Sequence, residues 1–96
     1  MFVGSLEIDL LLGDIHSLKQ KRSVVRPIVA SLARLRVSVA EVDDHDLHRR
    51  ARIGVAAVAG DTRHVGDVLD ACEALVSGRP EIEVLSVRRT VRGSND

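Results

Sequence analysis

Aromatic side chains are almost missing from this chain of 96 residues, which contains one phenylalanine and neither tryptophan nor tyrosine. RNA-recognition motifs stack bases on aromatic residues of their sheet, so RNA binding of that kind is not expected. The single cysteine, Cys72, excludes an internal disulfide, a cysteine-based zinc site and the paired cysteines of a metallochaperone. The formal net charge is zero, from 14 basic and 14 acidic residues, so attraction to nucleic acid or anionic lipid requires a local patch.

Long apolar runs are missing too. No stretch reaches the ~20 apolar residues of a membrane span, and the residues after Met1 lack the layout of a signal peptide. These absences predict a cytoplasmic protein without membrane contact.

Sequence motifs of the common enzyme classes are absent as well. Neither G-x-x-x-x-G-K-[ST] nor G-x-G-x-x-G occurs in the chain. Ser17 and Ser23 fit a helix cap and a helix surface better than a nucleophile, because no His–Asp couple stands at a recognisable spacing. Cys72 falls on an apolar helical face and is expected in the core. We therefore expect a protein that is not an enzyme and uses no cofactor.

What the chain does contain is regular periodicity. A hydrophobic content of 45% can build one core in a domain of this length. Period-two alternation and helical spacing of apolar residues predict four strands and two helices, with helix caps at Ser17 and at Asp61 or Thr62. In chain order the elements are a strand over 2–12, a helix to about 35, strands over 37–42 and 52–59, a helix to 78 and a strand over 81–91.

The sequence makes three further structural predictions, which concern Pro27, Gly78 and the C-terminal segment. Pro27 should kink the first helix or split it, because proline removes a backbone hydrogen bond. Gly78 suits a left-handed residue at the end of the second helix. Residues 1–91 are expected to form one domain and residues 92–96 a flexible tail.

The order of elements predicts an α+β fold, a ferredoxin-like βαββαβ sandwich with two helices on one face of a four-stranded antiparallel sheet. Right-handed crossovers give the strand order 4-1-3-2, with strand 37–42 at an edge. Glu7 and Asp9 are expected on the solvent face of the sheet. The start of the first helix, the polar connection over 43–50 and the turn at 78–80 should meet at one end of the fold.

The stretch HSLKQKRS, over residues 16–23, places three cations at the start of the first helix. Each opposes the helix dipole, at a cost of roughly 0.3–1 kcal/mol when exposed. Binding of an anion such as an RNA backbone would offset this cost. The candidate RNA- or anion-binding residues are Lys19, Lys21, Arg22 and Arg26. Alternatively, Asp43, Asp44 and Asp46 neutralise the cluster through surface ion pairs worth ~0–1 kcal/mol each.

Three of the four histidines, His16, His45 and His48, are expected at this same end of the fold. Histidine and carboxylate side chains can bind zinc. Their spacing, H-x-x-H within one loop plus one distant histidine, is a weak pattern, and exposed loop histidines are commoner. No metal site is predicted.

The strings HSLKQKRSVV, VSVAEV and RARIGVAAVAGD, with a D-x-D-L element at 44–47, resemble the YlxP-like family of small bacterial proteins. The likeness covers nearly the whole chain, and S-L-K-x-K-R at 17–22 is its most specific part. The resemblance implies a ferredoxin-like fold and carries over no catalytic residue. Because such proteins are often encoded beside translation and ribosome-maturation factors, it also implies a ribosome-linked role. Relatives tend to have an aromatic residue where this chain has His48, so a contact by that side chain does not carry over.

Two functions from different classes follow. The first is a non-enzymatic accessory of ribosome assembly or translation, which binds a ribosomal subunit or rRNA, and not DNA, through the basic start of the first helix. The second is a structural or regulatory module without nucleic-acid contact, which forms a homodimer through its sheet or an edge strand.

Overall fold

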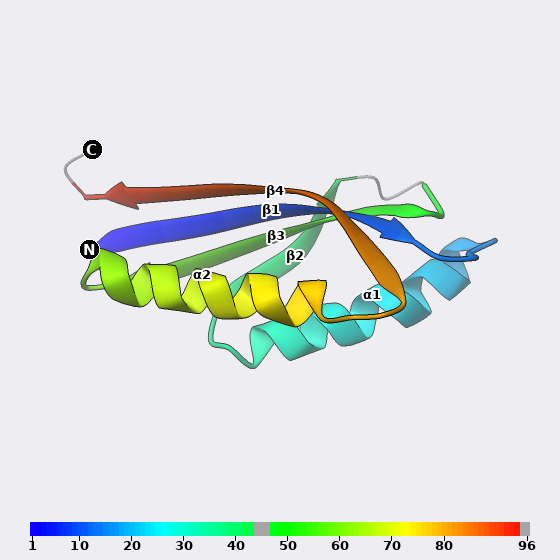
Figure 1. Ribbon diagram of the computed structural model, residues 1–96, viewed down its shortest axis with the longest axis horizontal. Coiled ribbons are helices and arrows are strands. Elements are labelled where there is room, and N and C mark those ends of the chain that lie inside the picture. Colours follow the sequence, from blue (N-terminus) through cyan, green and yellow to red (C-terminus); the bar gives the residue numbers. More distant parts are fainter. Residues whose placement is uncertain (44–46, 95–96) are drawn as a thin grey trace.

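The computed structural model describes residues 1–43 and 47–94, which form the predicted order of strands and helices (Figure 1). The elements are β1 (Phe2–Leu12), α1 (Leu18–Ala33), β2 (Ser38–Asp43), β3 (Arg50–Ala59), α2 (Thr62–Ser77) and β4 (Ile82–Gly93). No helix in this described part of the chain is long and apolar enough to cross a membrane.

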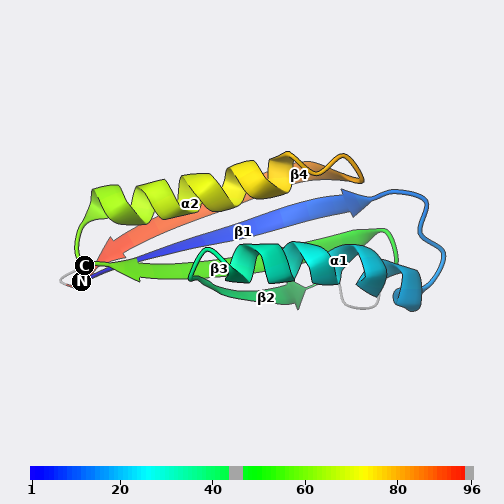
Figure 2. The same ribbon diagram turned by 90° about the horizontal axis from the view of Figure 1, so that it is seen from below.

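The four strands form one antiparallel sheet with the order β2-β3-β1-β4, which is the predicted order read from the other edge. Central strand β1 pairs with β3 and β4, so that Leu6 lies between Val55 and Arg89. Both helices cover the same face of the sheet, as Figures 1 and 2 show. The predicted ferredoxin-like α+β arrangement is confirmed.

The core lies between this face and the two helices. Alternation along β1 turns its even-numbered residues toward the helices, and the four from Leu6 to Leu12 are at most 1% exposed. The inward apolar residues of the helices are Val25, Ile28, Leu32, Val65, Leu69, Cys72 and Val76. Cys72 is completely buried, as predicted, and burial raises the pKa of its thiol.

Side-chain caps begin both helices. The Ser17 hydroxyl accepts a hydrogen bond from Gln20 N at 3.1 Å, and the Gln20 side chain accepts one from His16 N at 2.6 Å. The Asp61 carboxylate accepts from His64 N at 2.7 Å. Both predicted caps are confirmed, with Asp61 rather than Thr62 at the start of α2.

Of the two outcomes predicted for Pro27, a split of the first helix is wrong, because α1 runs unbroken from Leu18 to Ala33, and a kink stays a prediction. Val25 and Ile28 on either side of the proline are buried against the sheet, and this packing outweighs the lost backbone hydrogen bond. The prediction that Gly78 is left-handed is also wrong, because its φ of −80° lies in the right-handed helical region. Arg36, after α1, has a positive φ of 62°.

The last strand is longer than the sequence predicts. Arg92 and Gly93, assigned above to a flexible tail, pair with Val3 and Phe2 of β1. Ser94 N also donates a hydrogen bond to Met1 O at 3.0 Å. The remainder of the predicted tail lies outside the described residues.

Candidate nucleic-acid interface

Helix α1 presents a row of exposed cations. Residues 16–40 include six lysines and arginines and no acidic residue. The helical repeat places Lys19, Arg22 and Arg26 three and four residues apart on one side of α1, where all three are exposed. None of the three forms an ion pair with an acid of the described chain. We call these three residues the basic face.

Lys21 lies apart from the basic face. Its side chain is 3% exposed, and its ammonium is 2.8 Å from Glu41 Oε2 on β2, in a side chain that is 22% exposed. The pair ties α1 to β2, so Lys21 offers no surface charge to a ligand in this conformation. Of the four predicted binding residues, the structure therefore brings Lys19, Arg22 and Arg26 together and separates Lys21. The sequence held a signal, because Lys21 stands four residues before buried Val25.

Of the three acids that were expected to neutralise the cluster, the structure describes only Asp43. Asp43 Oδ2 lies 3.3 Å from Arg52 Nη1 across the sheet. Asp44 and Asp46 lie outside the described residues. Glu41 pairs with Lys21 of the HSLKQKRS stretch, and sequence reasoning missed this acid because it lies on another element.

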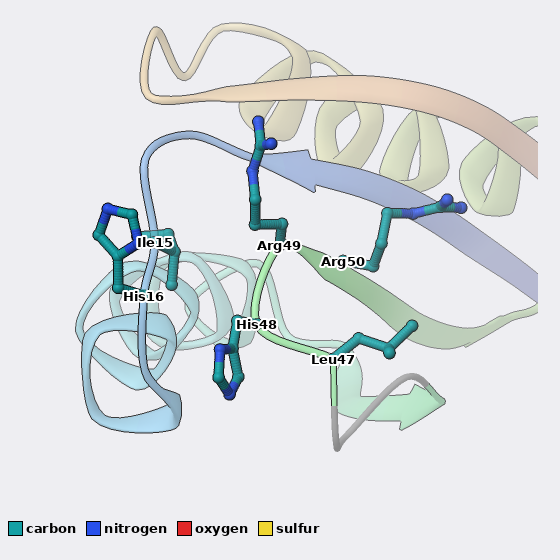
Figure 3. Close-up of a pocket in the computed structure, with 6 residues that line it drawn as sticks. All are labelled: Ile15, His16, Leu47, His48, Arg49 and Arg50. Atoms are coloured by element: carbon teal, nitrogen blue, oxygen red, sulfur yellow. The ribbon is translucent and has the colours of Figure 1, made fainter.

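The start of α1 lies beside the end of the β2–β3 connection, as predicted, and the two enclose an open hollow of about 490 Å³ (Figure 3). The side chains around the hollow do not converge. His16 and His48 point in different directions, and Arg49 Nε donates a hydrogen bond to Gly13 O at 3.1 Å. His16 Nε2 lies 2.8 Å from Asp14 Oδ1.

The metal hypothesis finds no support in this hollow. Within residues 1–43 and 47–94, no group of three His, Cys, Asp or Glu side chains could hold a metal ion. His45, the third histidine of the weak pattern, lies outside those ranges. The hollow therefore supplies neither a described ligand set nor a convergent anion site.

The open face of the sheet carries cross-strand ion pairs. Glu7 and Asp9 lie on this face, as expected. Glu7 pairs with Arg88 at 3.6 Å and Asp9 with Arg50 at 2.6 Å. The Asp9–Arg50 pair leaves Asp9 only 9% exposed, which the sequence did not predict. Phe2 packs against the core, so this face also lacks the aromatic residue that base stacking would need.

Comparison with known proteins places this arrangement in a family. The sequence profile of DUF503, described as a protein of unknown function, matches residues 3–89. The chain belongs to the DUF503 family. It is 30% identical to the uncharacterized protein YlxP of Bacillus subtilis (strain 168) over 82 residues, which are 84% of this chain and 89% of that protein. The resemblance found in the HSLKQKRS stretch is confirmed.

One solved structure supports the fold of this DUF503 chain. It is similar to a de novo designed protein with a ferredoxin fold, determined by solution NMR, at a TM-score of 0.51. The two share 17% identity over 98% of this chain and 88% of the designed one, which shows the fold alone. The structured domain of Drosophila melanogaster Boca matches at a TM-score of 0.48 and 15% identity, over 94% of this chain and 97% of that one.

Proposed function

We propose that this DUF503 protein is a non-enzymatic accessory of ribosome assembly or translation, which binds the phosphate backbone of RNA through the basic face of α1. One observation carries the proposal: three exposed cations share one side of a helix that contains no acid, and none is paired within the described chain. Exposed cations at a helix start oppose the dipole, and an anionic partner would offset that cost.

The dimensions of the basic face suit a backbone ligand. Lys19 and Arg26 are seven residues apart, which is roughly 10 Å along the helix axis. One strand of a duplex presents about three phosphates over that length. The face has no aromatic residue for base stacking, so the expected contacts read phosphates and carry little sequence information.

The family resemblance selects RNA as the ligand. The ribosome-linked role implied by the YlxP-like resemblance favours a ribosomal subunit or rRNA over DNA. The zero net charge of the chain gives no global attraction to polyanions, so binding must be local and therefore removable by a few substitutions.

The test is co-sedimentation with ribosomal subunits on sucrose gradients between about 50 and 200 mM salt. Wild-type protein should associate at the lower end and dissociate as the salt rises, because phosphate contacts release counterions. Arg22→Glu with Arg26→Glu should lower the affinity at least tenfold and reduce the slope of log affinity against log salt by roughly 1.4–1.8.

A control for charge reversal is available on α2. Arg63 is exposed there and has no ion pair in the part of the chain that the structure describes, so Arg63→Glu on the other helix matches the single variant Arg22→Glu. Arg63→Glu should leave the association unchanged. Co-sedimentation that is independent of salt and equal in wild type and the double variant would exclude the basic face from the function.

Self-association remains the second candidate, and exposed apolar residues on the open sheet face favour it. Val42 is 47% exposed and Val58 65% exposed, on an edge strand and on its neighbour. Sedimentation equilibrium from micromolar to millimolar protein tests it. A monomer mass of 10.4 kDa at every concentration would exclude a dimer.

A further inference from the structure

A second stripe of α1 lies beside its buried one and faces the outer side of β2. Val25, Val29, Ala30 and Ala33 line a hollow of about 380 Å³ there, with Arg22, Arg26 and Glu41 at its other end. Val29 is half-buried, and Ala30 and Ala33 are exposed. The hollow is therefore apolar toward the end of α1 and basic toward its start.

The strand beside this hollow has an open edge. β2 pairs with β3 on one side, and no other described strand pairs with it on the other (Figure 2). Its six residues include neither lysine nor proline, the usual protections of an edge. The Lys21–Glu41 pair shows how β2 runs relative to α1. The end of β2 lies near the basic part of α1, and the start of β2 lies near the apolar part.

We propose that this hollow and the β2 edge together bind an extended acidic segment of a partner protein, which adds to the sheet as a fifth strand. The segment's main chain hydrogen-bonds with β2, and alternate side chains enter the hollow. Apolar side chains contact Val29, Ala30 and Ala33, and acidic side chains pair with Arg22 and Arg26. The cations that have no acid in the described chain thus supply the specificity for negative charge.

Charge decides against a second copy of the chain as the occupant. Two β2 strands paired around a two-fold axis would bring two α1 helices side by side on one face of the joined sheet. Each copy would then present the three exposed cations of a helix that has no acid. Like charges at such a distance repel, whereas an acidic segment is complementary.

The proposal stands apart from RNA binding, although both use Arg22 and Arg26. The edge of β2 and the alanines of the hollow contribute nothing to a phosphate contact at Lys19. The two ligands should compete, and they can be told apart by which amides each one perturbs.

The experiment is an NMR titration of the ¹⁵N-labelled protein with a capped synthetic peptide of about eight residues, slightly longer than β2. The peptide carries glutamate at two alternate positions and then valine at two, with threonine between them. The amides of β2 and of residues 29–33 should shift, and amide exchange along β2 should slow at least tenfold. A peptide with lysine in place of glutamate should bind at least tenfold more weakly.

Matched variants locate the site. Ala30→Glu with Ala33→Glu fills the hollow with like charge and should weaken peptide binding at least tenfold. Ala71→Glu with Ala74→Glu places the same charges on exposed positions of α2 and should leave binding unchanged. Unchanged urea midpoints for both variants would show that the fold is intact.

Several results would overturn the proposal. They are the absence of β2 shifts at millimolar peptide, equal binding of the lysine peptide, or β2 shifts that follow protein concentration alone. Perturbation of the same β2 amides by oligouridylate, lost in Ala30→Glu with Ala33→Glu, would assign the hollow to RNA. Peptide binding by a protein that ignores ribosomal subunits would overturn only the function proposed above.

Discussion

The two helices occupy equivalent places in the fold and differ in what they show to solvent. Each has 16 residues, begins at a side-chain cap and buries four positions. α1 carries four cations and no acid, whereas α2 carries three acids and one cation. Asp70 of α2 pairs with Arg89 of β4 at 2.8 Å, while the basic face of α1 has no acid in the described chain. The sheet constrains the inward positions of both helices, whereas the outward charges of the two helices differ in sign and in pairing.

The equivalence of the two helices depends on their buried, inward positions. Leu32→Ala on α1 and Leu69→Ala on α2 each remove a completely buried side chain, so each should lower the free energy of unfolding by about 2–5 kcal/mol. Urea denaturation measures both. A cost below about 1 kcal/mol on either helix, which is typical of a surface substitution, would show that its face was assigned wrongly.

The inward position that differs is Lys21. Lys21→Met leaves the Glu41 carboxylate without its ammonium partner and should cost about 2–3 kcal/mol. Lys19→Met, two residues away and exposed, should cost under about 0.5 kcal/mol. Adding Glu41→Leu to Lys21→Met should restore most of the loss, because the pair is then replaced by apolar contact. Equal urea midpoints for Lys19→Met and Lys21→Met would contradict the burial of Lys21.

Each helix also contains one residue of low helix propensity, a proline in α1 and a glycine in α2. Pro27→Ala restores a backbone donor in α1 and should stabilise the protein by about 1–2 kcal/mol, less than the full helix penalty because the unfolded chain gains freedom. Gly66→Ala in α2, where a Cβ meets nothing within 4 Å, should stabilise it by about 0.5–1 kcal/mol. Pro27→Ala should therefore raise the thermal midpoint more than Gly66→Ala does. A destabilising Pro27→Ala would mean that α1 needs the proline ring.

The outward charges should matter least to stability. Arg26→Ala on α1 and Asp67→Ala on α2 are exposed and should each change the free energy of unfolding by under about 0.5 kcal/mol. Glu83→Ala on β4, also exposed, is the reference for a surface change outside both helices. A larger loss at Arg26 in urea denaturation would show that its charge serves the fold and not a ligand.

Much of the fold followed from local pattern, and the errors arose where distant elements meet. Alternation along β1 and the caps at Ser17 and Asp61 predicted the elements, and crossover handedness ordered the sheet. Lys21 was misplaced because its neighbours are equally basic, and the pairing that separates it lies on β2. Only its spacing of four residues from Val25 indicated that Lys21 is buried. The split predicted at Pro27 did not occur, because packing of the helix against the sheet outweighed the low helix propensity of proline.

The candidate site was predicted in composition but not in arrangement. The sequence named the cations of the basic face, since charge is visible residue by residue. It could not show the hollow beside β2, because that hollow depends on which residues of α1 lie next to Glu41 of β2. The Asp9–Arg50 pair likewise depends on strand register, which joins residues about forty positions apart in the chain.

The central position of β1 has a consequence for the order of folding. Phe2 pairs with Ala59 on one side and with Gly93 on the other, so the earliest strand of the domain needs partners from its middle and from its last strand. During synthesis at roughly 5–20 residues per second, β1 therefore keeps an unpaired edge until β4 has been made. Closing such distant pairs is slow compared with forming a helix. The helices can form early, but the sheet against which they pack is completed last.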